Sequence, residues 1–169
     1  MLPPESCCKA NFDGASKGNL GPSGCNGIIR NSYGEGIMAF SLPLGTQSNH
    51  FAEAKDAYEA IKLAFDMGFR WLWLEGDSKN IIDCIKCIIQ PSWTISNIIE
   101  GTHAIMDKFE RVYVTHVYRE ANFMADWFAN DGVRRNELMI WKMGRKLLEE
   151  ANNIINQEKI SRSMIEIKK

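Results

Sequence analysis

The chain has 169 residues, of which 45% are hydrophobic and 24% charged, a composition typical of one soluble globular domain. Its formal net charge is -1, which excludes a polybasic chain that binds nucleic acid by bulk charge alone. No apolar run approaches the ~20 residues of a membrane span, and the N-terminus has no basic segment followed by an apolar one. We therefore expect an intracellular protein, nuclear or cytoplasmic, with no signal peptide, transmembrane segment or membrane partner.

The first part of the chain predicts strands joined by tight turns. Eight of the 13 glycines lie between Gly14 and Gly45, interleaved with short apolar stretches such as GCNGIIR and GEGIMAFSLPL. This pattern is typical of an antiparallel meander, and we expect three strands in it.

Helical and strand patterns alternate in the rest of the domain. Residues 49–67 have helical periodicity, WLWLEGD indicates a buried strand, and a helix opened by a Ser78 cap is expected over 78–89. Further elements are predicted as a helix over 96–109, a strand at RVYVTHV and a helix over 121–131. The order βββαβααβα predicts an α/β domain whose five-stranded mixed sheet has three antiparallel strands, then two parallel ones, flanked by helices.

The charge is distributed unevenly along the chain. Residues 1–133 contain 11 Lys or Arg against 16 Asp or Glu, a balance of -5, whereas residues 134–169 contain nine against five, a balance of +4. We divide the chain into an N-terminal extension (1–8), a domain (9–133) and a basic amphipathic helical tail (134–169). The apolar stripe of the tail comprises Leu138, Trp141, Leu148, Ala151 and Ile155. This helix could pack on the domain, mediate self-association or contact phosphate, and the oligomeric state stays open.

Four carboxylates, Asp13, Glu53, Asp77 and Asp126, lie in or beside apolar segments. Buried acids repel one another, so several acids directed at one place imply a divalent cation held by oxygen ligands. Asp13 and Asp77 follow apolar strand patterns, where side chains from several strands can converge. Taken singly, each aspartate could be a turn or cap residue, and Glu53 could pair with a buried Arg.

The helix that carries Glu53 has two distinct sides. At ~100° per residue, three alanines lie within ~40° of Glu53, and the charged residues lie opposite. The alanines are Ala57, Ala60 and Ala64, and the charged residues are Lys55, Glu59, Lys62 and Asp66. Glu53 is therefore predicted to point into the protein.

The five cysteines have no extracellular spacing pattern, and we expect reduced thiols. Cys84 and Cys87 form a single CxxC within a helical pattern. Because no second Cys or His pair completes a zinc site, small buried residues on a helix are favoured over zinc or redox chemistry.

Four segments of the chain carry a family resemblance. They are FDGASKGNLGPSG, NHFAEAKDAYEAIKLA, LEGDSKNII and VTHVYREANFMADWFAN. In order and spacing they resemble the ribonuclease H family, most closely the plant RNase H-like domains related to retrotransposon reverse transcriptases. The resemblance covers residues 9–133 and implies the RNase H-like fold, in agreement with the element order.

The resemblance implies a metal-dependent endoribonuclease that hydrolyses the RNA strand of RNA–DNA hybrids, leaving 5′-phosphate and 3′-hydroxyl ends. Asp13, Glu53, Asp77 and Asp126 match the acids that hold two Mg²⁺ ions, or two Mn²⁺ ions in their place. One metal would activate a water and the other would stabilise the leaving oxygen. His116 matches a mobile histidine that helps proton transfer or product release; alternatively, it is a strand-end residue bonded to backbone.

Substrate contacts are implied at short polar residues, since RNA differs from DNA by its 2′-hydroxyl groups. Nucleic-acid contacts are also expected at Gly14 and at Arg119, which could touch phosphate or position its loop. The short polar residues that match are Ser16, Asn19, Asn49, Ser78 and Asn122. Each is also a typical turn, cap or loop residue. The basic handle of bacterial enzymes is absent, with only Lys86 and Lys108 near its expected place, which predicts weak substrate affinity.

Two other functions remain as alternatives. The first is a retroelement-derived module that binds nucleic acid without catalysis. The second is another metal nuclease of the same superfamily, such as a 3′-to-5′ exonuclease or a transposase-like domain. The GNxGPxG turn and the GDS and AD contexts of the acids disfavour the second alternative.

Overall fold

The computed structural model describes residues 7–13, 15–16, 20–117 and 139–142. The strands are β1 (Cys7–Phe12), β2 (Ala15–Ser16), β3 (Gly21–Arg30), β4 (Gly36–Gln47), β5 (Trp71–Gly76), β6 (Arg111–His116) and β7 (Met139–Lys142). The helices are α1 (Asn49–Asp66), α2 (Lys79–Ile85) and α3 (Ser96–Met106). Among these residues no helix has the length and apolar character needed to cross a membrane.

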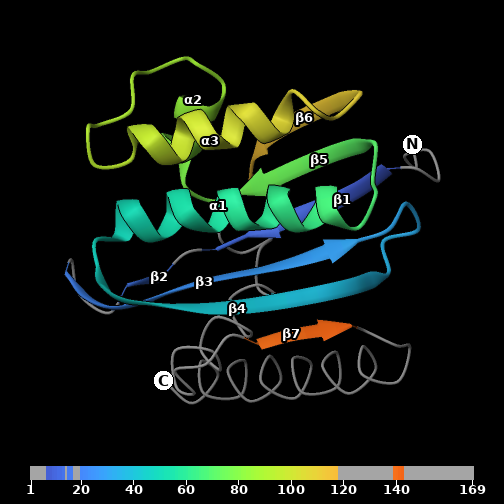
Figure 1. The fold of residues 1–169 in the computed structure, drawn as a ribbon, viewed down its shortest axis with the longest axis horizontal. Coiled ribbons are helices and arrows are strands. Elements are labelled where there is room, and N and C mark those ends of the chain that lie inside the picture. Colours follow the sequence, from blue (N-terminus) through green and yellow to red (C-terminus); the bar gives the residue numbers. More distant parts are fainter. Residues whose placement is uncertain (1–6, 14, 17–19, 118–138, 143–169) are drawn as a thin grey trace, which may run out of the picture.

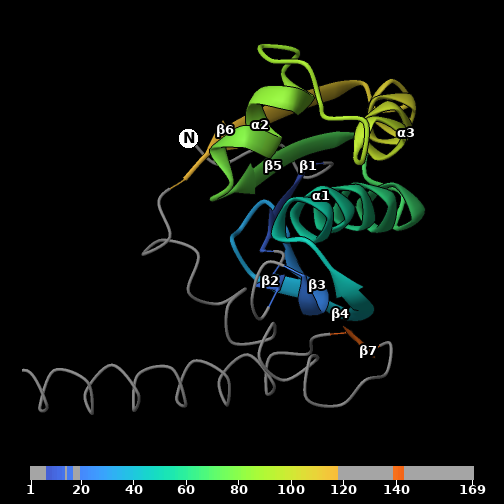
Figure 2. The same ribbon diagram turned by 90° about the vertical axis from the view of Figure 1, so that its left-hand side faces the viewer.

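The strands form one mixed sheet in the order β6-β5-β1-β3-β4-β7, with β2 paired to β3 (Figure 1). Strands β1, β3 and β4 are antiparallel neighbours, whereas β5 runs parallel to β1 and β6 runs parallel to β5. The prediction of three antiparallel strands followed by two parallel strands is confirmed. Figure 2 shows α1 and α3 side by side against this sheet.

Alternation along the strands explains the core beneath α1. Cys8, Ala10 and Phe12 of β1 join Leu72 and Leu74 of β5 in the buried apolar cluster. On the helix side the cluster contains the three predicted alanines, all fully buried: Ala57, Ala60 and Ala64. Their small side chains let the helix backbone approach the sheet closely.

The opposite side of α1 is charged, as predicted. Lys55 pairs with Glu59 at 2.7 Å, and Lys62 pairs with Asp66 at 3.2 Å, each at a spacing of four residues. Side chains four residues apart share one helix face, so these pairs mark its solvent-facing side.

In the tail, residues 139–142 form strand β7 where the sequence predicted helix. Met139 pairs with Ser41 and Lys142 with Met38, so β7 extends the sheet beyond β4. An open strand edge offers unpaired backbone groups, and a short apolar run satisfies them by pairing. Helical spacing in the sequence does not reveal such a partner. The other residues of the predicted tail helix, and the predicted helix over 121–131, lie outside the described residues.

Helix α2 ends at Ile85, earlier than the predicted Ile89. Cys87 follows with a φ of 57°, a left-handed conformation that a right-handed helix cannot continue. Cys84 is buried on the helix as expected, whereas Cys87 is exposed beyond it. All five cysteines are free thiols in this structure.

Candidate active site

Three adjacent strands bring candidate residues to one edge of the sheet. Phe12 of β1 is the register partner of Gly76 of β5, and Gly76 is the partner of His116 of β6. Asp13 and Asp77 follow these paired residues directly, so both aspartates and the histidine lie where the parallel strands end. The arrowhead of β5 marks this edge in Figure 1.

Asp13 is held at this edge by its own backbone. Its N–H donates to the carbonyl oxygen of Asn26 at 2.9 Å, which continues the ladder between β1 and β3 by one residue. The residue is only 2% exposed. A carboxylate buried to this extent is costly unless charge or hydrogen bonds compensate it.

Glu53 reaches the same edge from helix α1. Its Oε2 accepts a 2.7 Å hydrogen bond from the hydroxyl of Ser78, the residue that follows Asp77. Ser78 is the N-cap residue of α2, as predicted, but its hydroxyl makes no capping hydrogen bond. The half-buried Glu53 is therefore directed inward, and its link to Ser78 joins α1 to the chain beside Asp77.

His116 is exposed, and its Nε2 lies 3.1 Å from the backbone carbonyl oxygen of Asp77. Since a carbonyl oxygen only accepts, this contact requires the tautomer with the proton on Nε2. The His116 ring therefore makes the hydrogen bond to backbone that the alternative role of a strand-end residue predicts. The same bond keeps the ring beside Asp77.

Asp56 is a buried acid that the sequence reasoning missed. It lies on α1 three residues after Glu53 and is fully buried. Burial raises the pKa of its carboxyl well above the usual range, and the charges of Asp13 and Glu59 act in the same direction. The backbone amides of Asn26 and Asp13 oppose this rise in pKa. Helical spacing could have revealed this residue, because Asp56 lies next to Ala57 on the buried side of α1.

The remaining predicted contacts fall into two groups. Asn49 begins α1 and is exposed, after an N-cap in which Ser48 Oγ accepts from the N–H of Phe51 at 3.2 Å. Ser16 lies in β2 opposite Ser23 of β3. Five predicted site residues lie outside the described residues: Gly14, Asn19, Arg119, Asn122 and Asp126.

The donor chemistry of the site fits a divalent cation. Asp13, Glu53 and Asp77 offer carboxylate oxygens from three elements, and hard cations such as Mg²⁺ prefer such ligands. A cation would also offset the repulsion by which the charge of Asp13 helps raise the pKa of the buried Asp56. Among the described residues, no three His, Cys, Asp or Glu side chains converge closely enough to hold an ion, and Asp126 is not among these residues.

Comparison with known proteins places the chain in a family. The model of the reverse transcriptase-like family matches residues 11–132. The chain belongs to the reverse transcriptase-like family. An Arabidopsis thaliana relative named "Putative ribonuclease H protein" is 36% identical over 122 residues, 72% of this chain and 20% of that protein. Ribonuclease HI of Halobacterium salinarum is 27% identical over 129 residues, 73% of this chain and 63% of that protein. The chain thus spans less than two thirds of either relative.

The solved structures that resemble this reverse transcriptase-like chain include RNase H1 proteins, and the chain has the RNase H fold. RNase H1 from Halobacterium salinarum superposes with a TM-score of 0.73 at 26% identity, covering 76% of this chain and 98% of that one. LC11-RNase H1 from compost, solved with an RNA/DNA hybrid, gives a TM-score of 0.71 at 21% identity, covering 76% and 97%. The five central strands in the order β4-β3-β1-β5-β6 form the mixed sheet of that fold.

Proposed function

We propose that this chain is a metal-dependent endoribonuclease that hydrolyses the RNA strand of RNA–DNA hybrids. The observation that carries the proposal is the common edge of β1, β5 and β6. Asp13, Asp77 and His116 lie at this edge. Glu53 is linked to it by the hydrogen bond from Ser78. Family membership and an RNase H fold neighbour solved with a hybrid support the same substrate class.

In this proposal Asp13, Glu53, Asp77 and Asp126 hold two Mg²⁺ ions, or two Mn²⁺ ions in their place. The ions would activate a water and stabilise the leaving oxygen during in-line attack on the phosphodiester. Two divalent cations would also offset most of the -5 balance of residues 1–133.

We assign His116 as a proton carrier in this reaction. Its ring is exposed and its Nε2 is bonded to the backbone of Asp77, so it can exchange that bond for one to the departing 3′-oxygen. Delivery of a proton there would give the 3′-hydroxyl end, and attack by water would leave phosphate on the 5′ end.

Substrate selection would depend on short polar groups near the same edge. Asn49 is exposed at the start of α1, and Ser78 is the N-cap residue of α2. Such groups can contact 2′-hydroxyls across the shallow minor groove of a hybrid. We assign the same role to Gly14, Ser16, Asn19 and Asn122, and a phosphate contact to Arg119.

The test is cleavage by the full chain of a labelled RNA–DNA hybrid, beside single-stranded RNA and double-stranded DNA. We expect cutting only in the RNA of the hybrid, only with Mg²⁺ or Mn²⁺, and none in EDTA. Asp77→Asn should abolish cutting without lowering the urea midpoint, since it removes one of several mutually repelling acids. Asp83→Asn is the matched control, because Asp83 pairs with the exposed Lys79 on α2 and should be dispensable.

Two results would contradict the proposal. A wild-type chain that binds the hybrid without cutting it in either metal would favour the non-catalytic module. Cutting that persists in Asp77→Asn would remove this carboxylate from the chemistry.

A further inference from the structure

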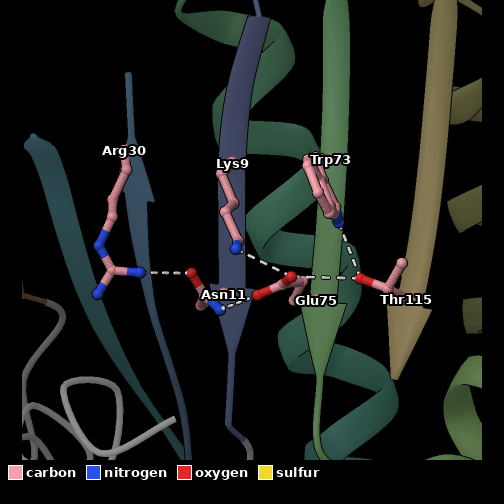
Figure 3. Close-up of polar contacts among 6 residues, drawn as sticks. All are labelled: Lys9, Asn11, Arg30, Trp73, Glu75 and Thr115. Carbon is pink, nitrogen blue, oxygen red and sulfur yellow. Dashed lines mark hydrogen bonds and ion pairs between the residues drawn. The ribbon is translucent and has the colours of Figure 1, made fainter. Parts of the chain in front are cut away.

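Polar side chains of four strands form one network on the sheet face opposite α1 (Figure 3). Since Cys8, Ala10 and Phe12 face the core, the alternating Lys9 and Asn11 of β1 face the other way. The same alternation on β5 presents Trp73 and Glu75 on this face. Arg30 of β3 and Thr115 of β6 complete the network.

The centre of the network is Asn11 with Glu75. They are register partners in the parallel pair β1 and β5, and they are 3% and 7% exposed. Asn11 Nδ2 donates to Glu75 Oε2 at 3.0 Å. Arg30 Nη1 donates to Asn11 Oδ1 at 2.7 Å, so the amide is fixed from both sides.

The other oxygen of Glu75 is also engaged. Lys9 Nζ lies 2.9 Å from Oε1, and the Thr115 hydroxyl donates to the same oxygen at 3.4 Å. Thr115 in turn accepts from the indole Nε1 of Trp73 at 2.8 Å. A buried carboxylate whose oxygens are all bonded in this way is a poor candidate for a metal ligand, so its role must be a different one.

Position along the strands relates this pair to the candidate active site. Asn11 precedes Asp13 by two residues, and Glu75 precedes Asp77 by two. Residues two apart on an extended chain share a face and lie roughly 7 Å apart. On this face of the sheet, Asn11 and Glu75 are thus the last pair of partner residues of β1 and β5 before the two aspartates.

The network carries a net positive charge at this position before the two aspartates. Lys9 and Arg30 contribute two positive charges against one negative charge on Glu75, which leaves an excess of one positive charge behind the acidic edge. A positive charge near carboxylates favours their charged forms, and the hydrogen bond between Asn11 and Glu75 holds the ends of β1 and β5 together.

We propose that Asn11 and Glu75 are positioning residues of the divalent-metal site, which fix the separation of Asp13 and Asp77 before a cation binds. The inference rests on the proposed function, because it presumes that these two aspartates hold the metal. Partners that orient metal ligands are the groups whose loss weakens metal binding without any contact to the ion.

The test is calorimetric titration of Mn²⁺ into the metal-free full chain, with variants that exchange the amide and the carboxylate. Asn11→Asp places two carboxylates face to face, and Glu75→Gln removes the charge that Lys9 pairs with. Each should raise the Mn²⁺ dissociation constant about 10-fold or more. The double variant again pairs one amide with one carboxylate between Lys9 and Arg30, and should recover most of the lost affinity.

A matched control and a milder variant keep the result interpretable. Glu110→Gln removes the charge that Arg70 faces at 3.9 Å at the other end of the sheet, and should leave Mn²⁺ binding unchanged. Thr115→Val keeps the side-chain shape and removes one donor to Glu75, so it should raise the dissociation constant about threefold even if stronger variants fail to fold. Urea unfolding in EDTA measures the stability of each variant.

Wild-type affinity in both single variants and in Thr115→Val would overturn the inference, and so would a double variant as weak as the sum of the singles. The proposed function fails separately, if the wild type binds Mn²⁺ but does not cut the hybrid. A wild-type chain that binds no Mn²⁺ would overturn both.

Discussion

Ser78 donates its hydroxyl to Oε2 of Glu53 at 2.7 Å, and this bond crosses from α2 to α1 immediately beside Asp77. It orients a half-buried carboxylate that we assign to metal binding. Ser78→Ala should therefore lower the hybrid-cleavage rate about 10-fold at limiting Mg²⁺, because the carboxylate loses its orienting partner. The free energy of unfolding should fall by only about 1 kcal/mol. Initial rates across a Mg²⁺ series and urea unfolding measure the two effects.

Ser96→Ala is the control for this prediction. The Ser96 hydroxyl bonds to the exposed carbonyl of Trp93 at 3.3 Å, and its loss should change neither the rate nor its Mg²⁺ dependence. If Ser78→Ala needed no more Mg²⁺ than the wild type, the bond to Glu53 would be structural only.

Gly76 lies directly beneath the ring of Phe12 on the neighbouring strand. A Cβ at Gly76 would sit 2.2 Å from the Cζ atom of Phe12, far inside van der Waals contact. Gly76→Ala should therefore lower the free energy of unfolding by about 1 to 3 kcal/mol, because the fully buried ring must shift. Urea unfolding of the metal-free protein measures this change.

Two comparisons separate the clash from other effects of the substitution. Adding Phe12→Leu to Gly76→Ala should recover part of the stability that the clash removes. Gly101→Ala should have little effect. The atom nearest to the added Cβ would be Cε2 of Tyr58 at 3.2 Å, and the half-buried Tyr58 side chain can shift. Equal losses in Gly76→Ala and Gly101→Ala would contradict this account.

The sequence sufficed for features that depend on periodicity within one segment. The buried side of α1 follows from the spacing of Ala57, Ala60 and Ala64, and the edge position of Asp13 and Asp77 follows from the strands that precede them. The arrangement of three antiparallel strands followed by two parallel ones could also be predicted from the alternation of elements, and the family resemblance from four motifs in a fixed order.

Features that need a tertiary partner were not available from one segment. Strand β7 forms because it pairs with the open edge of β4, and the helical periodicity of the tail sequence gives no information about that partner. Ser78 had the pattern of an N-cap, yet its hydroxyl bonds across to Glu53. The Asn11–Glu75 contact requires the register of β1 against β5, a property of two segments together.

The cysteines should differ sharply in reactivity. Cys87 is exposed, whereas the other four are buried, and burial raises the pKa of each of their thiols, that of Cys8 to about 12. The thiolate is the reactive form, so a disulfide reagent near neutral pH should label one thiol rapidly in the native protein and five after unfolding. Cys87→Ser should remove the rapid phase. A rapid phase that survives this change would show that a buried thiol is accessible.

Asp56 should make the metal-free protein less stable as pH rises. Its carboxyl is fully buried, and within the described chain neither oxygen has a hydrogen bond of ordinary geometry. Burial and the charges of Asp13 and Glu59 raise its pKa well above 3.8, despite the opposing backbone amides of Asn26 and Asp13. Above pH 3.8 the unfolded chain loses this proton first, so the folded state becomes less favoured until the pH passes the folded-state pKa.

Asp56→Asn removes this titration while keeping nearly the same shape. In EDTA, the wild type should lose stability from about pH 5 to about pH 8 more steeply than the variant, which should be the more stable at the upper pH. Urea midpoints at the two pH values measure the difference. Asp66→Asn is the control on the same helix, since Asp66 is exposed, pairs with Lys62 at 3.2 Å and is not among the charges that raise the pKa of Asp56, so the loss of stability with pH should persist in it. Equal slopes in the wild type and Asp56→Asn would mean that Asp56 titrates alike in the folded and unfolded chain.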